Sequence, residues 1–170
     1  MNALQRRKYI MGRLEEGGAP VSATVLAGEL SVSRQIIVGD VALLRAGGAH
    51  ITATPRGYVL ERPPEGRRFT IACRHTPEEM ARELEIMVDN GCTVENVIVE
   101  HSVYGQLVGQ LMLSSRYDVA EFIRKVSESG SKPLSDLTGG IHLHTLRCPD
   151  EAAFQRVQEE LDREGLLVKN

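Results

Sequence analysis

The chain has 170 residues, of which 42% are hydrophobic and 25% are charged, as in globular proteins with one large or two small domains. It contains no apolar run of about 18 residues, which excludes a membrane-spanning helix. The basic start at Arg6-Arg7-Lys8 lacks the apolar stretch that follows it in a signal peptide, so we expect a cytoplasmic protein. Aromatic residues make up only 4%, which argues against nucleic-acid binding by base stacking.

Charge divides the chain into two parts. Residues 1–62 hold eight Lys/Arg against five Asp/Glu, whereas residues 63–170 hold twelve against eighteen. A basic front and an acidic back suggest that only the front part meets a polyanion. A cluster of Pro, Gly and charged residues lies between them, and it predicts a domain at 1–62, a linker at 63–68 and a second domain at 69–170.

The front part has the pattern of a winged helix-turn-helix. Apolar residues at helical spacing predict helices over 4–16, 22–30 and 33–46, and alternating residues predict a short hairpin over 50–60. The tight turn before the third helix allows that helix to enter a DNA major groove.

Five residues are candidates for DNA contact. Ser33 caps the third helix, and Arg34, Gln35 and Val38 lie outside its apolar stripe near its N-terminus. Arg pairs with guanine or phosphate and Gln with adenine, while Arg56 at the hairpin tip suits phosphate or the minor groove. The alternative is a winged helix that binds another protein. Charge, caps and hairpin together favour double-stranded DNA.

The back part alternates strands and helices in the order βαββαβα, which predicts an α+β domain of two layers, with helices on one face of a mostly antiparallel sheet. The helix after the first strand starts with a capping box, Thr76-Pro77-Glu78-Glu79. The expected strands are 69–73, 94–100, 104–113 and 140–148, and the expected helices are 76–91, 116–129 and 150–164.

Two histidines in the last strand suggest a metal site. His142 and His144 are two residues apart, so their imidazoles point to the same side of a strand. His75 precedes the capping box, and Glu83 borders the apolar stripe of the following helix. A His₃Glu set suits nickel, zinc, iron or manganese. The alternatives are strand histidines that face solvent and an exposed helix acid.

The three cysteines do not have the spacing of a metal or redox motif. Cys73, Cys92 and Cys148 are odd in number and lack a CxxC pair. We expect them to be reduced, buried and small apolar residues of a cytosolic protein. Ligation of a metal by one of these thiolates is the less favoured reading.

Several segments resemble the niacin-responsive transcriptional repressors. In the front part these are Ser33–Asp40 (SRQIIVGD), Leu44–Gly48 (LRAGG) and Gly57-Tyr58. In the back part, His75, Glu100–Gly105 (EHSVYG) and Gly139–Thr145 (GGIHLHT) resemble the three-histidine (3H) domain of that family. The chain differs from the family's pattern at Val38 and Gly39, where polar DNA-reading residues are expected.

The resemblance implies a repressor of niacin uptake or NAD-biosynthesis genes with nicotinic acid as co-repressor. It also implies an HPr-like fold for the back part and a divalent metal at the positions of His75, Glu83, His142 and His144. A twofold operator would require a homodimer. The pyridine nitrogen of nicotinate could fill an open metal position, and its carboxylate needs donors. The candidate donors are His101, Tyr104, Thr138 and the amides of Gly139 and Gly140.

Two other functions fit the residues. One is a sensor that responds to the metal ion itself. The other is a metal-dependent enzyme fused to a winged helix, with Glu100 as general base, although no catalytic motif surrounds that residue.

Overall fold

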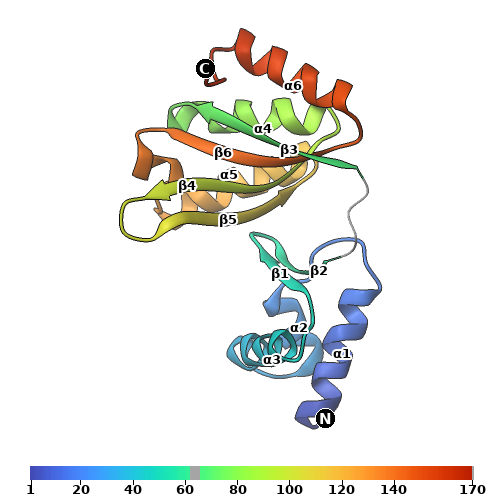
Figure 1. Ribbon diagram of the computed structural model, residues 1–170. Helices are drawn as coiled ribbons and strands as arrows, with labels where there is room; N and C mark the ends of the chain where they lie inside the picture. The colour runs from blue at the N-terminus through green and yellow to red at the C-terminus, as the bar shows by residue number, and fades with distance from the viewer. Residues whose placement is uncertain (62–65, 170) are drawn as a thin grey trace. The chain divides into compact units, whose positions relative to one another are not determined.

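The computed structural model describes residues 1–61 and 66–169, and the chain divides into two compact units, Met1–Pro63 and Pro64–Asn170 (Figure 1). Each unit has its own hydrophobic core. The predicted linker, 63–68, lies partly outside the described residues. Its last two residues, Arg67 and Arg68, are in the first strand of the second unit and not in a linker.

The first unit is a three-helix domain with a hairpin. Its elements are α1 (Ala3–Glu15), α2 (Ala23–Leu30), α3 (Arg34–Ala46), β1 (Ile51–Thr54) and β2 (Gly57–Leu60). Side chains of Asn2, Ser22 and Ser33 accept hydrogen bonds from amides in the first turns of the three helices, as N-caps do. Apolar residues of all three helices and of β1 form the core, namely Ile10, Leu14, Ala23, Leu26, Ala27, Ile37, Val41 and Ile51.

A buried ion-pair cluster ties α1 to α3. The carboxylate of Asp40 accepts hydrogen bonds from the guanidinium of Arg6 and, at 3.4 Å, from Arg7. Asp40 is buried, so the charge it carries requires such partners. Arg6 and Arg7 therefore hold the helices together and are not simply a basic start exposed to solvent.

The second unit is a four-stranded antiparallel sheet with three α-helices. Its strands are β3 (Arg67–Arg74), β4 (Thr93–His101), β5 (Gly105–Leu113) and β6 (Ile141–Cys148), in the order β3-β6-β4-β5. The α-helices are α4 (Met80–Asp89), α5 (Arg116–Ser129) and α6 (Glu151–Arg163), and the short 3₁₀ helices are η1 (Pro77–Glu79) and η2 (Leu134–Thr138). The predicted α+β class and the βαββαβα order are confirmed; η2 was not predicted.

One face of this sheet carries the core and the other is left open by the helices. Along β6, burial alternates residue by residue, so that His142, His144, Leu146 and Cys148 point to the buried side. Residues from α4, α5 and α6 pack with the inward residues of the strands in a single cluster. Figure 1 shows the same two layers, with the helices gathered on one side of the sheet. Among the described residues, no helix is long and apolar enough to cross a membrane.

The expectation of three reduced cysteines is wrong for two of them. Cys92 and Cys148 form a disulfide, with 4.2 Å between their Cα atoms, and Cys73 is free and buried. The reason is the sheet register. Thr93 pairs with Arg147, so the residues before and after that pair face each other across β4 and β6. A separation of 56 residues hides this proximity in the sequence.

Candidate metal centre

Strand β6 presents two imidazoles to the buried face of the sheet. His142 and His144 are 3% and 2% exposed, and their ring centroids are 4.8 Å apart. The alternation of a strand places both on the same side, as the HxH spacing predicts. The alternative of two histidines facing solvent is therefore not the arrangement found.

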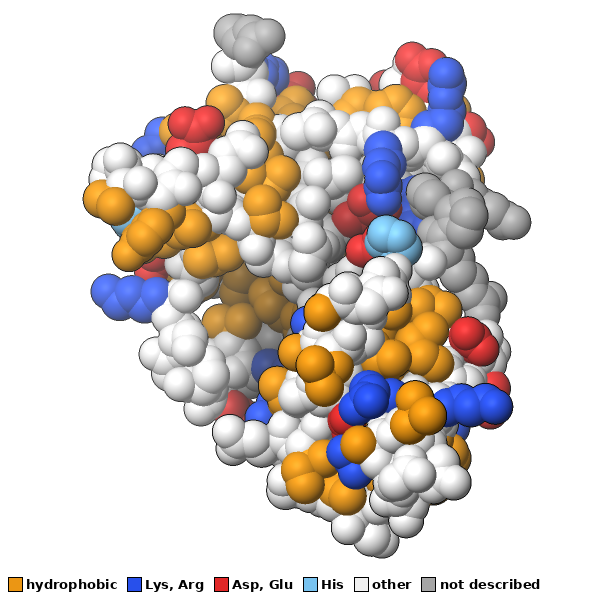
Figure 2. All heavy atoms as spheres, turned by 60° about the horizontal axis from the view of Figure 1, so that its bottom comes forward, with side chains coloured by type: hydrophobic (Ala, Val, Ile, Leu, Met, Phe, Trp, Pro, Cys, Tyr) orange, Lys and Arg blue, Asp and Glu red, His pale blue; other side chains and the backbone are white. Residues whose placement is uncertain are grey.

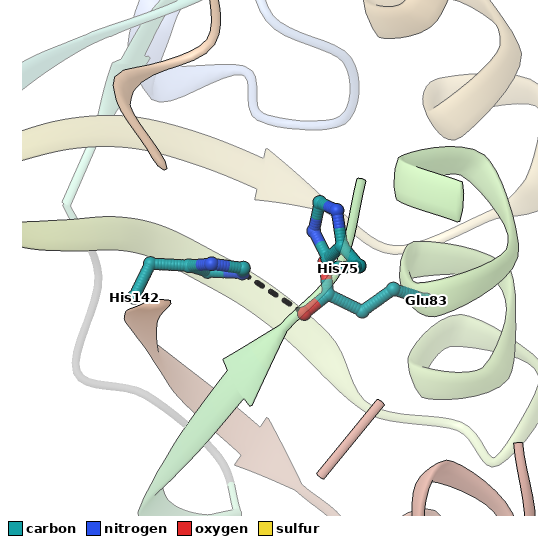
Figure 3. Close-up of side chains that lie close together, drawn as sticks. All are labelled: His75, Glu83 and His142. Carbon is teal, nitrogen blue, oxygen red and sulfur yellow. Dashed lines mark hydrogen bonds and ion pairs between the residues drawn. The ribbon is translucent and has the colours of Figure 1, made fainter. Parts of the chain in front are cut away.

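A carboxylate and a third imidazole meet this pair, and Figure 3 shows them, Glu83 and His75, beside His142. Glu83, from α4, is 1% exposed, so the reading of an exposed helix acid does not hold; the neighbouring Arg82 pairs with Glu164 instead. The Nε2 atoms of His75, His142 and His144 lie 2.7, 3.0 and 3.4 Å from carboxylate oxygens of Glu83. The ligand atoms of His75, Glu83 and His142 all lie within 4.8 Å of one another, which is compact enough to hold a metal ion.

Each of the three imidazoles is oriented by a backbone carbonyl. The Nδ1 atoms of His75, His142 and His144 lie 2.7, 2.8 and 2.6 Å from the carbonyl oxygens of Thr76, Gly140 and Asn96. A carbonyl oxygen can only accept, so each Nδ1 carries the hydrogen. In the neutral ring, Nε2 then holds a lone pair directed at the other ligands. This is the arrangement by which proteins orient metal-binding histidines.

The polar atoms at the centre of the cluster are not satisfied by one another. Glu83 Oε2 and His144 Nε2 are buried and have no hydrogen-bond partner, although they are only 3.4 Å apart. Neutral imidazole Nε2 and a carboxylate oxygen both accept, so their mutual approach is favourable only if a proton or a cation lies between them. The residues present therefore fit a divalent cation.

The charges of the cluster support each other. Burial would raise the pKa of Glu83, but the attraction of its carboxylate to the imidazoles around it, His144 first and then His142 and His75, outweighs burial and lowers that pKa well below its usual value. For His75, burial opposes protonation, but the carboxylate of Glu83, 2.7 Å from its Nε2, prevails and raises the pKa. A metal would have to displace the proton that His75 holds.

Cys73 lies beside this cluster and is protonated. It faces His142 across β3 and β6 and has no exposed surface. Burial first, and then the negative charge of Glu83, raise the pKa of its thiol far above the ordinary value. These directions favour the expected small apolar role over thiolate ligation.

The residues expected to bind a nicotinate carboxylate differ in whether their hydrogen-bond donors are already used within the protein. His101 ends β4, and its Nδ1 accepts from the amides of Val103 and Tyr104, so the neutral ring carries its hydrogen on Nε2 and can donate it. Tyr104 is 74% exposed and its ring centroid lies 5.1 Å from that of His101.

The Gly139-Gly140 turn has another role. The amides of Gly139 and Gly140 both point at the carbonyl of Ser135, and the hydroxyl of Thr138 bonds the carbonyls of Ser135 and Ile141. These donors are already used. A side chain at Gly140 would come within 2.9 Å of the carbonyl oxygen of His75, so this glycine permits close approach of the His75 turn.

The expected DNA-contacting residues lie on one exposed stretch of α3, except for the hairpin residue. Arg34, Gln35 and Val38 are exposed, and Ser33 uses its hydroxyl to cap the amide of Ile36. Arg56 lies in the β1–β2 turn and is partly buried. Figure 2 shows Lys and Arg side chains interspersed with hydrophobic ones on the visible face of this unit. The exposed hydrophobic residues include Val25, Ile36, Val38 and Leu43.

Two family models match the two units. Residues 68–170 match the 3H domain and residues 6–59 match a helix-turn-helix (HTH) domain. The chain belongs to the 3H family. It is 45% identical to the "probable transcription repressor NiaR" of Thermotoga maritima and 39% identical to the "transcription repressor NadR" of Bacillus subtilis. Both comparisons cover 97% of this chain and 94% of the relative. The HTH domain and these relatives identify the chain as a DNA-binding transcription repressor and not an enzyme, as expected.

One residue that supports the site in this 3H domain was not found by sequence reasoning. The pairing of β4 with both neighbours shifts around Asn96. The side-chain oxygen of Asn96 accepts from the amide of Thr145 at 3.0 Å, while its backbone carbonyl accepts from His144. Because the side chain takes over one bond to β6, the carbonyl is available to orient the imidazole. An Asn directly after Glu95 in a strand of mostly apolar residues is the only signal in the sequence, and it is a weak one.

Proposed function

We propose that this chain represses niacin uptake or NAD-biosynthesis genes, with nicotinic acid as co-repressor at a divalent-metal site. Residues 1–62 read a double-stranded operator, and residues 69–170 bind the metal and nicotinate. The protein acts as a homodimer in the cytoplasm. The observation that carries the proposal is the convergence of three oriented imidazoles on the buried carboxylate of Glu83.

The ligands would be His75, Glu83, His142 and His144. A bound divalent ion would supply a Lewis-acidic centre that the pyridine nitrogen of nicotinate could ligate. The protein itself fixes the tautomer of each imidazole through a backbone carbonyl. His101 would donate from Nε2 to the carboxylate of nicotinate, and Tyr104 from its hydroxyl. The amides of Gly139 and Gly140 and the hydroxyl of Thr138 would contribute only if the turn between η2 and β6 rearranged.

DNA recognition falls to the N-terminal end of α3. Arg34 and Gln35 are exposed at that end and have the chemistry for guanine or phosphate and for adenine. Val38 and Ile36 are 41% and 42% exposed, and such side chains suit the methyl group of thymine. Ser33 fixes the start of the helix, and Arg56 is assigned to phosphate beside the groove.

The test is a gel-shift titration on DNA from upstream of the chain's own gene, with nicotinic acid, nicotinamide or a chelator. We expect nicotinic acid to tighten operator binding, nicotinamide to have little effect and the chelator to abolish the response. If metal alone at micromolar concentration switched DNA binding fully, the site would be a metal sensor and the co-repressor proposal would be wrong.

Two variants separate the two halves of the proposal. His142→Ala with His144→Ala should abolish metal content, measured by mass spectrometry, and the nicotinate response, while weak nonspecific DNA binding remains. Arg34→Ala should weaken operator binding by about 5- to 150-fold, the effect of losing about 1–3 kcal/mol, and leave nicotinate binding intact. His50→Ala, an exposed histidine of the first unit, is the control. Full metal occupancy in the double-histidine variant would refute the proposed site.

A further inference from the structure

The two edges of the four-stranded sheet differ. The outer edge of β3 is covered by the C-terminal segment: Cys73 pairs with Leu167, the amide of Arg74 donates to Leu166, and the amide of Val168 donates to Ala72. At the other edge lies β5. Within residues 1–61 and 66–169, no backbone hydrogen bond joins β5 to any segment besides β4.

Strand β5 also lacks most of the features that keep an exposed edge from pairing. Natural edges are protected by charged residues, proline, bulges or a covering segment. The nine residues of β5, Gly105–Leu113 (GQLVGQLML), include no charged residue and no proline, whereas β3 carries three arginines. The pairing of β5 with β4 shifts register near Met112, whose φ is +53°, so only the C-terminal end of β5 is irregular. The regular and unprotected segment is Gly105–Gln110.

The sequence of this segment is self-complementary about Val108. Gln106 and Gln110 lie two residues on either side of it, so all three side chains point to the same face. In an antiparallel pair of two copies with the twofold axis at Val108, Gln106 lies opposite Gln110 of the other copy. Their amides can exchange hydrogen bonds. On the opposite face, Leu107 lies opposite Gly109 of the other copy, over which the side chains of Leu134 and Val97 already lie.

A row of apolar residues on the open face ends at the same position. Ala72 pairs with Leu143, Leu143 with Ile98 and Ile98 with Val108, one residue from each strand. Val108 is 48% exposed. With the twofold axis at Val108, this row would meet its symmetry mate and run uninterrupted through eight strands. Any other register would break it.

We propose that two copies of this chain pair through β5, antiparallel and centred on Val108, to form one eight-stranded sheet. The inference rests on the proposed homodimeric repressor and names the surface that makes the dimer. The partner is a second copy because the segment carries no charge that would oppose self-pairing and because Gln106 and Gln110 complement each other in hydrogen bonding across the twofold axis.

A charge exchange tests both the surface and the register. Gln106→Lys with Gln110→Lys places lysines opposite each other across the twofold axis, and we expect the dimer dissociation constant in sedimentation to rise at least tenfold. Gln106→Glu with Gln110→Lys places opposite charges there and should restore it to within threefold of the wild type. Residues four apart in one strand are about 13 Å apart, so this rescue acts only between copies. Unchanged metal content and circular dichroism show that each variant folds.

A cross-link provides the second test. Val108→Cys should give a disulfide-linked dimer under mild oxidation, because the two introduced thiols face each other at the twofold axis. Thr70→Cys is the control, since it is an exposed β-branched residue at the opposite edge of the sheet. Equal cross-linking of the two variants would overturn the inference.

The remaining outcomes also decide. A wild-type chain that is monomeric at micromolar concentration overturns the inference, and so does a lysine pair that leaves the dimer intact. If that lysine pair still dimerises and still shows a nicotinate-dependent gel shift, the β5 interface is wrong while the proposed function stands. If the wild type dimerises through β5 but shows no nicotinate-dependent gel shift, the proposed function is wrong while the β5 interface stands.

Discussion

In the metal-free protein, we expect Glu83→Gln to lower the free energy of unfolding at acidic pH and to raise it at alkaline pH. In the folded chain the pKa of Glu83 is lowered well below 4.5, so its contribution to stability is present above that pH and lost as the pH falls further. The pKa of His75 is raised above 6.5, so its contribution is present below 6.5 and lost as the pH rises through the raised value. The wild type should therefore gain most from this pair between about pH 4.5 and 6.5.

The size of each stability change follows from the hydrogen bonds and ion pairs that the cluster can form when its imidazoles are protonated or neutral. At pH 5.5 the substitution removes the anion beside a buried imidazolium, which costs about 3 kcal/mol. At pH 9 the imidazoles are neutral, and each Nε2 accepts. Glutamine then adds N–H donors where the carboxylate had none, and one such bond stabilises by about 1 kcal/mol. The stability curves of variant and wild type should cross above pH 6.5.

Calorimetry in the presence of a chelator, without reducing agent, measures this directly. For a unit of this size, about 1 kcal/mol corresponds to roughly 5 °C in Tm, so the expected shifts are about −15 °C at pH 5.5 and +5 °C at pH 9. Glu85→Gln, on the same helix but partly exposed, is the control and should follow the wild type within about 0.5 kcal/mol. A Glu83→Gln curve parallel to the wild type at all pH values would refute the coupling of Glu83 to the imidazoles.

Three further changes have expected outcomes. Gly39→Ala should stabilise the first unit by up to about 1 kcal/mol, because its Cβ meets nothing within 4 Å, and should weaken operator binding if α3 approaches DNA there; Gly28→Ala, equally open, should stabilise without that loss. Asn96→Ala should lower metal affinity about 10- to 100-fold by calorimetric titration, and Asn96→Asp, which keeps the acceptor, should recover most of it. Reduction of Cys92–Cys148 should lower the unfolding free energy by up to about 4 kcal/mol in urea titrations and leave metal content unchanged.

The predictable part of the fold followed from local patterns. Caps at Ser22 and Ser33 set the starts of two helices within one residue, and the period-two spacing of His142 and His144 gave their common face. Glu83 was selected because it borders the apolar stripe of its helix. The structure buries it completely, since α4 packs against the sheet along that border.

What could not be predicted depends on register between distant strands. The Cys92–Cys148 disulfide requires the pairing of Thr93 with Arg147, and the role of Asn96 requires a shift in that same pairing. Neither leaves a periodic signal. The engagement of the Gly139 and Gly140 amides could not be predicted for a different reason: it depends on η2, a short 3₁₀ helix that leaves no helical repeat in the sequence.

The disulfide and the imidazole cluster fix opposite ends of the same strand. Cys148 ties the end of β6 to the start of β4, whereas His142, near its beginning, reaches Glu83 across 59 residues of sequence. A cation held by Glu83 and the imidazoles would therefore cross-link α4 to the end of β6 that the disulfide leaves free. That end adjoins the η2 turn and the segment that carries His75. A ligand at the cluster would thus act on turns and not on strand register, because the register is already fixed from the other end. Under the proposed function, the response to nicotinate would therefore lie in the segments around η2 and His75, with the sheet as the frame that the disulfide holds.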